Sequence, residues 1–331
     1  MQENLIQTID PAAYAALVSG AALLPRPDAG ALRLTDADRS DFLHRMTSNN
    51  INALRPGQSA VTVLTSPTAR ILYVLTVVCQ EDALLVLPAP GQAQPLARHL
   101  RGQVFFMDKV KIADASEEFG RLRLLGPLAA EVLGRLGIDA SAAAANAVLA
   151  HDDLLVVAQP HYEIPGYEVV VPTARQAEVV AALEGAGAAP LTDTAAYTAR
   201  RIELGRPAAG HELTEEYNPL EAGLAWACAE NKGCYTGQEI IARQITYDKV
   251  TRTLVGLVAA QPLTPGAEVM VEGRSMGQVT SAAHSPALGA PIALAVIKRP
   301  ANTPGTEVTV DMSDGAATAQ VVSLPFVTEP A

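Results

Sequence analysis

Cysteines are scarce in this sequence, and their spacing excludes the sites that cysteines usually build. Among 331 residues there are three: Cys79, Cys228 and Cys234. An odd number at irregular spacing argues against a disulfide framework and favours a reducing compartment, which we take to be the cytoplasm. C-x2-C pairs are absent, so neither a structural zinc site nor a self-contained iron–sulfur site is expected. The histidines also lack the H-x-x-x-H and H-E-x-x-H spacings of metal sites, so we expect no metal.

Long apolar runs and an excess of positive charge are also missing. No stretch of about 18 apolar residues occurs that could cross a membrane, and the N-terminal residues lack the positive region of a signal peptide. Asp and Glu total 35 against 24 Lys and Arg, for a net charge of −11. That balance argues against a broad nucleic-acid-binding face, although it leaves room for a local basic pocket that holds a small anion.

Turn residues divide the chain into two regions that differ in their expected secondary structure. Residues 10–24, opened by an Asp-Pro pair, predict a helix. Short strand-like runs between residues 60 and 88 predict a largely antiparallel sheet, and a similar mixture of strands and helices follows. We therefore expect an α+β region over residues 1–250, made of two related subdomains with a break near 115–150. From there, short strands punctuated by Gly and Pro predict a small β-barrel over residues 251–331.

The most informative segment reads KGCYTGQE and begins at Lys232. Thr236 and Glu239 have the spacing of a capping box, which predicts a helix beginning at about Gly237. Free N–H groups at such a helix start, together with the ammonium of Lys232, would favour the thiolate form of Cys234. The pattern predicts a reactive cysteine, and the alternative is a structural cysteine in a loop.

This segment resembles the signature K-G-C-Y-x-G-Q-E of the YgfZ family of folate-binding proteins, in the superfamily of the glycine-cleavage T-protein. The signature positions are Lys232, Gly233, Cys234, Tyr235, Gly237, Gln238 and Glu239. Other segments resemble the T-protein superfamily in the same order along the chain: DRSDFLHRMTSNNI (38–51), RRIELGRP (200–207), NPLEAGLAWA (218–227) and GQVTSAAHSP (277–286).

The resemblance implies a T-protein-like fold, with antiparallel sheets and helices around a central channel that holds tetrahydrofolate or a derivative. It also implies a role in the assembly or repair of iron–sulfur enzymes, including those that thiolate transfer RNA. Iron–sulfur proteins or their assembly factors would then be partners. In this role Cys234 would act as the nucleophile or sulfur-handling group, and Lys232 would tune its charge.

The resemblance also points to folate contacts. Arg201, in the segment that matches R-x-E-x-G, could hold a folate carboxylate by a two-point contact, and the alternative is a salt bridge to Glu203 or another helix carboxylate. The T-protein's pterin-holding glutamate, in its G-E-D-G-F-E run, aligns with Ile164. Glu163 and Glu168 are the nearby carboxylates that could replace it.

Two further departures concern the reaction. The aspartate that assists aminomethyl transfer in the T-protein aligns with Val74, which has neither a proton to exchange nor a charge to stabilise an iminium. An asparagine expected after the third strand aligns with Pro88. The loss of the aspartate favours the YgfZ branch over a working aminomethyltransferase, and the loss of the asparagine implies that folate binds differently or more weakly. Two alternatives stay open: a one-carbon transferase in which another carboxylate takes over, and a non-catalytic scaffold that binds a protein partner through the cysteine loop.

Overall fold

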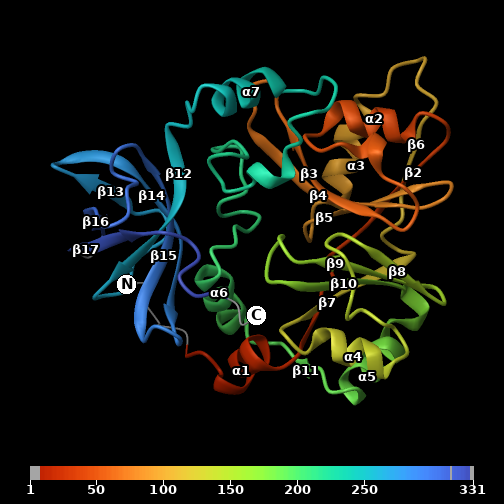
Figure 1. The fold of residues 1–331 in the computed structure, drawn as a ribbon, viewed down its shortest axis with the longest axis horizontal. Helices are drawn as coiled ribbons and strands as arrows, with labels where there is room; N and C mark the ends of the chain where they lie inside the picture. The colour runs from red at the N-terminus through yellow and green to blue at the C-terminus, as the bar shows by residue number, and fades with distance from the viewer. Residues whose placement is uncertain (1–7, 314, 329–331) are drawn as a thin grey trace.

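The computed structural model describes residues 8–313 and 315–328 and consists of two packed sheets and a separate barrel (Figure 1). The first sheet is five-stranded and antiparallel, in the order β3-β4-β5-β2-β6. Its elements are β2 (Leu32–Thr35), α2 (Arg39–Met46), η1 (Ile51–Ala53), β3 (Ser59–Thr65), β4 (Ile71–Cys79), β5 (Leu84–Pro88), α3 (Ala93–Arg101) and β6 (Lys111–Asp114). Helices α2 and α3 pack on one face of this sheet.

The second sheet has six strands in the order β11-β1-β7-β10-β9-β8. Its elements are β1 (Ala22–Pro25), β7 (Phe119–Leu125), α4 (Ala129–Arg135), β8 (Val148–His151), β9 (Leu154–Gln159), β10 (Gly166–Pro172), η2 (Thr173–Arg175), α5 (Gln176–Gly185) and β11 (Ala189–Pro190). All its strand pairs are antiparallel except β1 with β11. Helices α4 and α5 cover its outer face.

The two sheets bury their inner faces against each other. Leu85 and Leu87 of β5 meet Val157 of β9 and Val170 of β10 in one apolar cluster. Alternate residues of β5 point the other way, toward α2 and α3, so the whole strand is buried. Because strand side chains alternate between faces, a run buried on both sides must be apolar throughout, as the sequence LLVLP is.

The N-terminal segment differs from the prediction of one helix over residues 10–24. Helix α1 (Pro11–Ser19) begins as predicted, with Asp10 accepting a hydrogen bond from the backbone N–H of Ala12 at 2.9 Å. It ends at Gly20, and residues 22–25 form β1, which hydrogen-bonds to β7 and β11. The helix prediction failed there because distant strands determine the conformation of this apolar segment.

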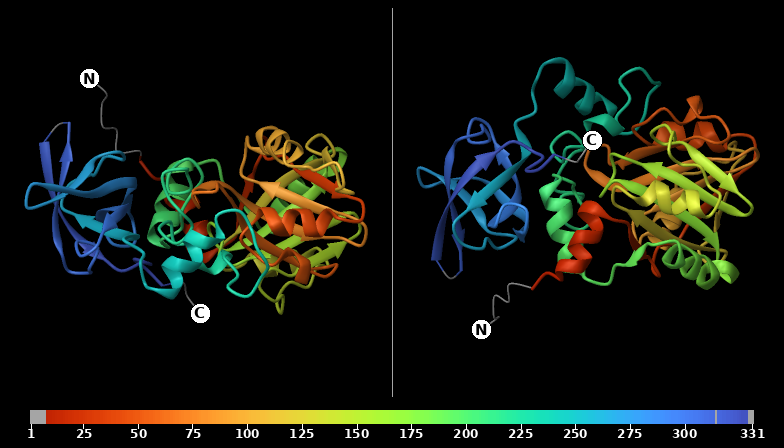
Figure 2. Two further views of the ribbon diagram at one scale, coloured as in Figure 1. Left: turned by 90° about the horizontal axis from the view of Figure 1, so that it is seen from above. Right: turned by 60° about the horizontal axis from the view of Figure 1, so that its bottom comes forward.

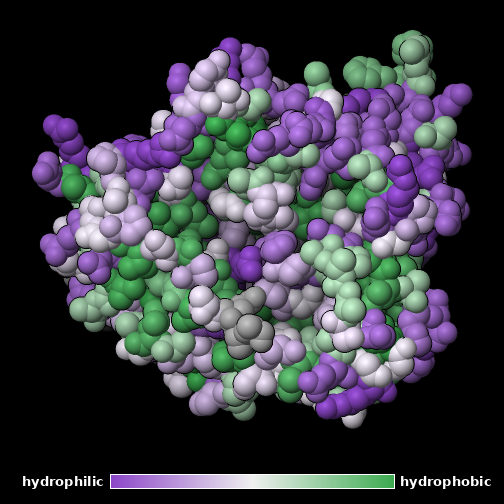
Figure 3. Space-filling model, viewed as in Figure 1, coloured by the Kyte–Doolittle hydropathy of each residue, from purple (hydrophilic) through white to green (hydrophobic). Residues whose placement is uncertain are grey.

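The C-terminal strands close into a barrel, in the order β12-β15-β14-β13-β16-β17. They are β12 (Arg252–Ala259), β13 (Glu268–Val271), β14 (Arg274–Ser285), β15 (Ala290–Lys298), β16 (Glu307–Met312) and β17 (Gly315–Val322). The α+β class and the small C-terminal barrel are thereby confirmed. Helix α6 (Thr194–Glu203) lies between the barrel and the sheets, and its Ile202 packs on Ile292 and Leu294 of β15 (Figure 2). Near this junction the surface is hollowed (Figure 3).

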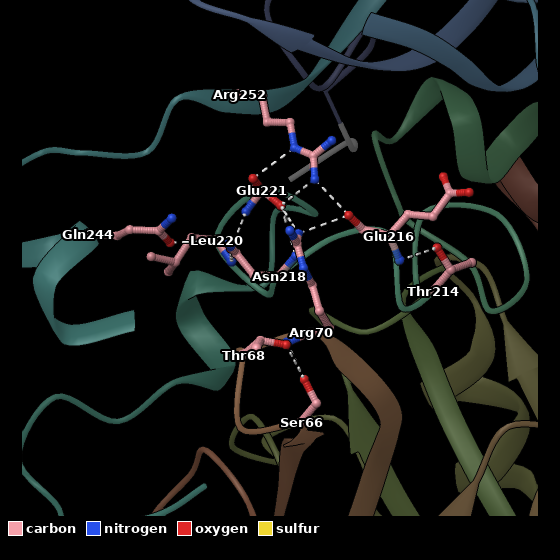
Figure 4. A network of polar contacts seen from close by, with 10 residues as sticks. All are labelled: Ser66, Thr68, Arg70, Thr214, Glu216, Asn218, Leu220, Glu221, Gln244 and Arg252. Atoms are coloured by element: carbon pink, nitrogen blue, oxygen red, sulfur yellow. Dashed lines mark hydrogen bonds and ion pairs between the residues drawn. The ribbon is translucent and has the colours of Figure 1, made fainter. Parts of the chain in front are cut away.

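A long linker with η3 (Ala225–Ala227) connects α6 to α7 (Gln238–Thr246), and the carboxylate of Glu221 fixes its path. Glu221 is buried and accepts hydrogen bonds from Arg252 Nε at 2.8 Å, Arg70 Nη1 at 3.3 Å and the backbone N–H of Asn218 at 2.9 Å. Figure 4 shows these groups converging from the first sheet, the linker and the barrel. One side chain therefore joins three parts of the fold.

Replacing Glu221 with Gln tests this role. The change leaves two partly exposed guanidinium groups without their shared counter-charge, so we expect the free energy of unfolding to fall by about 2 kcal/mol. Glu178→Gln is the control, because Glu178 forms an exposed ion pair with Arg175, whose loss should lower the free energy of unfolding far less. Urea unfolding measures both, and equal losses would contradict the role assigned to Glu221.

Candidate functional site

The KGCYTGQE segment forms the end of the linker, immediately before α7, and presents its cysteine to solvent. Cys234 is exposed, whereas Cys79 and Cys228 are buried. Burial raises the pKa of Cys79 and raises that of Cys228 to about 11. Both buried thiols are therefore protonated and shielded at neutral pH, and Cys234 is the cysteine that a reagent or partner can reach.

Lys232 anchors this segment to the first sheet. Its Nζ donates hydrogen bonds to the backbone carbonyl oxygens of His44 at 2.6 Å, Thr47 at 2.5 Å and Asn49 at 2.8 Å. The ammonium also stands 4.8 Å from the ring centroid of Tyr235. Burial lowers the pKa of Lys232 to about 8. The ammonium is committed to carbonyls on α2 and the loop after it, so the structure gives Lys232 an anchoring role, and its tuning of Cys234 stays a prediction.

Helix α7 begins where predicted, but without the predicted cap. Its N-cap is Gly237, at φ +83, and no side chain caps it. Thr236 instead accepts a hydrogen bond at its carbonyl from Thr65 Oγ1 at 2.6 Å, and Glu239 pairs with Arg243 on the exposed face. A Cβ at Gly237 would lie 2.7 Å from the carbonyl oxygen of Ser66. Close approach to the β3–β4 turn, rather than a capping box, explains this part of the motif.

A histidine that the sequence did not single out lies against the cysteine loop. His44 is 9% exposed, and its Nδ1 accepts a hydrogen bond from the backbone N–H of Asn52 at 3.4 Å. Its Nε2 lies 3.7 Å from the position that a Cβ on Gly233 would occupy. Burial, and then the charge of Lys232, lower the pKa of His44. A neutral imidazole therefore adjoins the residue before Cys234. In the sequence, the only signal for His44 was its location in segment 38–51, which resembles the T-protein superfamily.

The two glutamates proposed as pterin contacts belong to a buried cluster of charges on the second sheet. Glu168, on β10, accepts a hydrogen bond from Arg121 Nε at 2.6 Å and is 1% exposed. Its other oxygen lies 3.9 Å from Arg26 and 3.8 Å from Arg123. Glu163 pairs with Arg26 at 2.5 Å. Oε2 of Glu168 accepts no hydrogen bond from the described residues, but it is fully buried, so a pterin could reach it only if the cluster opened.

Glu163 is better placed to meet a ligand. Its side chain is 12% exposed, and only one of its oxygens takes a hydrogen bond from the described residues. Burial alone would raise the pKa of Glu163, but the guanidinium groups of Arg26 and Arg123 outweigh burial and hold that pKa below its usual range. Its φ of +58 is unusual for a residue with a side chain. In the resemblance this position aligns with the first glycine of G-E-D-G-F-E, which explains the backbone conformation.

Arg201 is buried and engaged by protein groups. It pairs with Glu212 at 3.3 Å and donates to Ser281 Oγ at 2.6 Å and to the carbonyl oxygen of Arg206 at 3.2 Å. The partner carboxylate lies in the linker, whereas the alternative had named Glu203 or another helix residue. A folate carboxylate at Arg201 would compete with Glu212, so the predicted contact stays a prediction.

The positions that depart from the T-protein pattern are all buried. Val74, on β4, is 4% exposed in an apolar cluster with Tyr162 and Tyr217. Pro88 ends β5, and its carbonyl oxygen accepts a hydrogen bond from Arg121 at 2.6 Å. Ile164 is 2% exposed and packs among residues of α1 and α6. None of these three side chains can donate or accept a proton.

Over residues 8–313 and 315–328, no group of three or more His, Cys, Asp or Glu side chains could hold a metal ion. No helix in the same ranges is long and apolar enough to cross a membrane.

Family models match both parts of the chain. The GCVT N-terminal domain matches residues 12–232, and the glycine cleavage T-protein C-terminal barrel domain matches residues 252–328. The chain belongs to the glycine-cleavage T-protein family. This membership supports the superfamily resemblance stated above, whereas the YgfZ branch within the superfamily stays a prediction.

Individual relatives of this T-protein family member carry different names. A protein of Arabidopsis thaliana named as a chloroplastic transferase is 31% identical over 321 residues, which cover 91% of this chain and 71% of that protein. The aminomethyltransferase of Thermus thermophilus is 32% identical over 294 residues, covering 86% and 81%. The crystal structure of the glycine cleavage system aminomethyltransferase T from Bartonella henselae superposes with a TM-score of 0.86 over 96% of this chain and 89% of that one. At 23% identity, that superposition shows a shared fold.

Alkylation tests the accessibility of the cysteines. A limiting amount of iodoacetamide should label Cys234 at least tenfold faster than either other cysteine, because the other two are buried as thiols. Peptide mass mapping of the folded protein gives the three rates, and the same measurement in urea, where they should converge, is the control. Even labelling of the folded protein, or labelling mainly at Cys79, would show that Cys234 is an ordinary loop residue.

Proposed function

We propose that this T-protein family member binds tetrahydrofolate or a derivative and does not transfer aminomethyl groups. The observation that carries the second half is the environment of Val74. The resemblance places the assisting aspartate of the T-protein there, and the side chain lies in a nearly closed apolar cluster. A carboxylate at that point would lose its hydration without gaining a cation, so the cluster suits valine and not a proton-transfer group.

The proposal assigns the pterin to Glu163. An ionised carboxylate with one oxygen free can accept a charge-assisted hydrogen bond from the N–H groups at the edge of a pterin. The arginines around Glu163 keep it ionised and hold it in position. In the resemblance, Glu163 stands one residue before the position of the T-protein's glutamate. Folate would therefore be held from a slightly different point than in the T-protein.

We further propose that the protein belongs to the YgfZ branch of the superfamily and acts in iron–sulfur cluster maintenance in the cytoplasm. Cys234 would be its nucleophile or sulfur-handling group. The support is the KGCYTGQE segment together with an exposed thiol on an anchored loop. Iron–sulfur proteins or their assembly factors would meet the protein at this loop. Effects on transfer RNA would be indirect, through the enzymes that depend on those clusters.

A one-carbon transferase is the second candidate, because relatives such as that of Thermus thermophilus are named aminomethyltransferases. That reaction needs a group that exchanges protons near the reactive nitrogens of the folate. Of the two carboxylates in the buried charge cluster, Glu163 is the one whose side chain is partly exposed, and its lowered pKa makes it a poor proton donor at neutral pH. The geometry therefore favours folate binding without aminomethyl transfer.

Calorimetric titration tests the folate proposal. We expect 5-formyltetrahydrofolate to bind the full chain, and Glu163→Gln to weaken binding about tenfold, because an ionic acceptor becomes a neutral one. Glu178→Gln, a remote glutamate that is also paired with an arginine, is the matched control and should leave affinity unchanged. The absence of heat at millimolar ligand would contradict folate binding, whereas equal affinity of the Glu163 variant would contradict only the pterin assignment.

A transfer assay tests the second half of the proposal. With tetrahydrofolate and an aminomethylated lipoyl carrier protein, we expect a rate at least about 100-fold below that of the Thermus thermophilus enzyme, since removal of a general acid–base group costs about 100- to 10,000-fold. The Thermus enzyme serves as the positive control in the same assay. Turnover within tenfold of it would show that another group replaces the aspartate.

A further inference from the structure

A pocket of about 470 Å³ lies between α6, α1 and the turn that joins β9 to β10. Leu17 of α1, Leu204 just after α6, Ile164 and Tyr167 give it largely apolar walls, and Ala145 stands on the loop that leads to β8. This volume falls in the range of pockets that bind small organic molecules. None of the described residues that line it is acidic.

Arg200 is the charged group in this wall, and its guanidinium is only partly paired by protein groups. The residue is 4% exposed, and its Nη1 lies 3.3 Å from Oε2 of Glu203. Its Nε is buried without a hydrogen-bond partner among the described residues. Glu203 is shared, because it also accepts hydrogen bonds from Tyr14 at 2.7 Å and from Ser285 at 2.6 Å. A buried guanidinium with an unpartnered N–H beside a cavity is suited to an acceptor that arrives from outside the chain.

The pocket also differs in charge from its counterpart in the T-protein pattern. Ile164, which lines it, aligns with the pterin-holding glutamate, so an acidic group is lost where a ligand would lie. The neighbouring arginine, Arg201, is fully used by Glu212 and Ser281. The anion-binding capacity of α6 therefore rests on Arg200. Such a pocket selects a ligand that offers an anionic acceptor instead of N–H donors.

We propose that this pocket binds an organic carboxylate on a flat or branched apolar body, with Arg200 as its anion anchor. The apolar walls bury the body, and the carboxylate lies against the guanidinium edge that Glu203 leaves open. Two sources offer this chemistry: the aminobenzoyl-glutamate half of a folate, and a free aromatic or aliphatic carboxylic acid. The first source rests on the proposed function, and the second does not.

The test uses p-aminobenzoyl-L-glutamate, which carries the carboxylates without a pterin, in calorimetric titrations of the full chain. Arg200→Gln should weaken binding at least tenfold, and Arg200→Lys should recover part of the loss because it restores the charge. Since Arg200 is buried, Ala145→Trp gives an independent variant that fills the pocket from an exposed position. Ala144→Trp is its matched control, exposed but not lining the pocket, and should stay within twofold of the parent protein.

The outcomes separate this proposal from the folate proposal. Equal losses for p-aminobenzoyl-glutamate and 5-formyltetrahydrofolate on Arg200→Gln would support the folate tail as the source. Loss for the first ligand alone would support a free carboxylic acid. Unchanged affinity of both ligands in both Arg200→Gln and Ala145→Trp would overturn the pocket proposal and leave folate binding standing. The absence of binding by p-aminobenzoyl-glutamate at millimolar concentration would overturn it as well.

Discussion

The arrangement of this protein depends on hydrogen bonds to one buried carboxylate, that of Glu221. It receives guanidinium groups from Arg70, at the turn before β4, and Arg252, at the start of the barrel. Its own carbonyl oxygen accepts the backbone N–H of Leu254 at 2.9 Å. Between α6 and α7 the linker contains only short helical turns. Ion pairs, instead of strand hydrogen bonds, therefore hold it in place. Cys234 owes its position to this arrangement and to the Lys232 anchor at the other end of the linker.

Buried charge is a second theme of the molecule. Arg26, Arg121 and Arg123 share Glu163 and Glu168 behind the β9–β10 turn, where an unpaired ion would be costly. Apolar packing alone would be at least as stable at such a place, so the charges contribute a defined geometry more than stability. They fix the turn that carries Glu163 and Ile164, and Ile164 lines the pocket beside Arg200.

Features set by local sequence were predictable, and features set by distant partners were not. The barrel strands β16 and β17 follow from alternation, and the buried β5 follows from a short apolar run between turn residues, both of which are local signals. The predicted end of α1 was wrong because residues 22–25 form a strand by pairing with the distant strands β7 and β11. The motif residues gave the location of the site. Sequence could not show that Lys232 would meet carbonyls of α2 and the loop after it, or that Arg201 would be satisfied while Arg200 was not.

The position of β1 has a consequence for how the chain is made. Its four residues emerge early in synthesis, yet its hydrogen-bonding partners are β7 and then β11, whose last residue is Pro190. The first sheet can assemble before β1 finds its partners. During that time the apolar residues of β1 are unpaired and accessible to chaperones and to neighbouring nascent chains. Once in place, β1 is an internal strand and not a frayed end. Loss of β1 would therefore leave β7 as an unpaired edge strand and β11 without a partner.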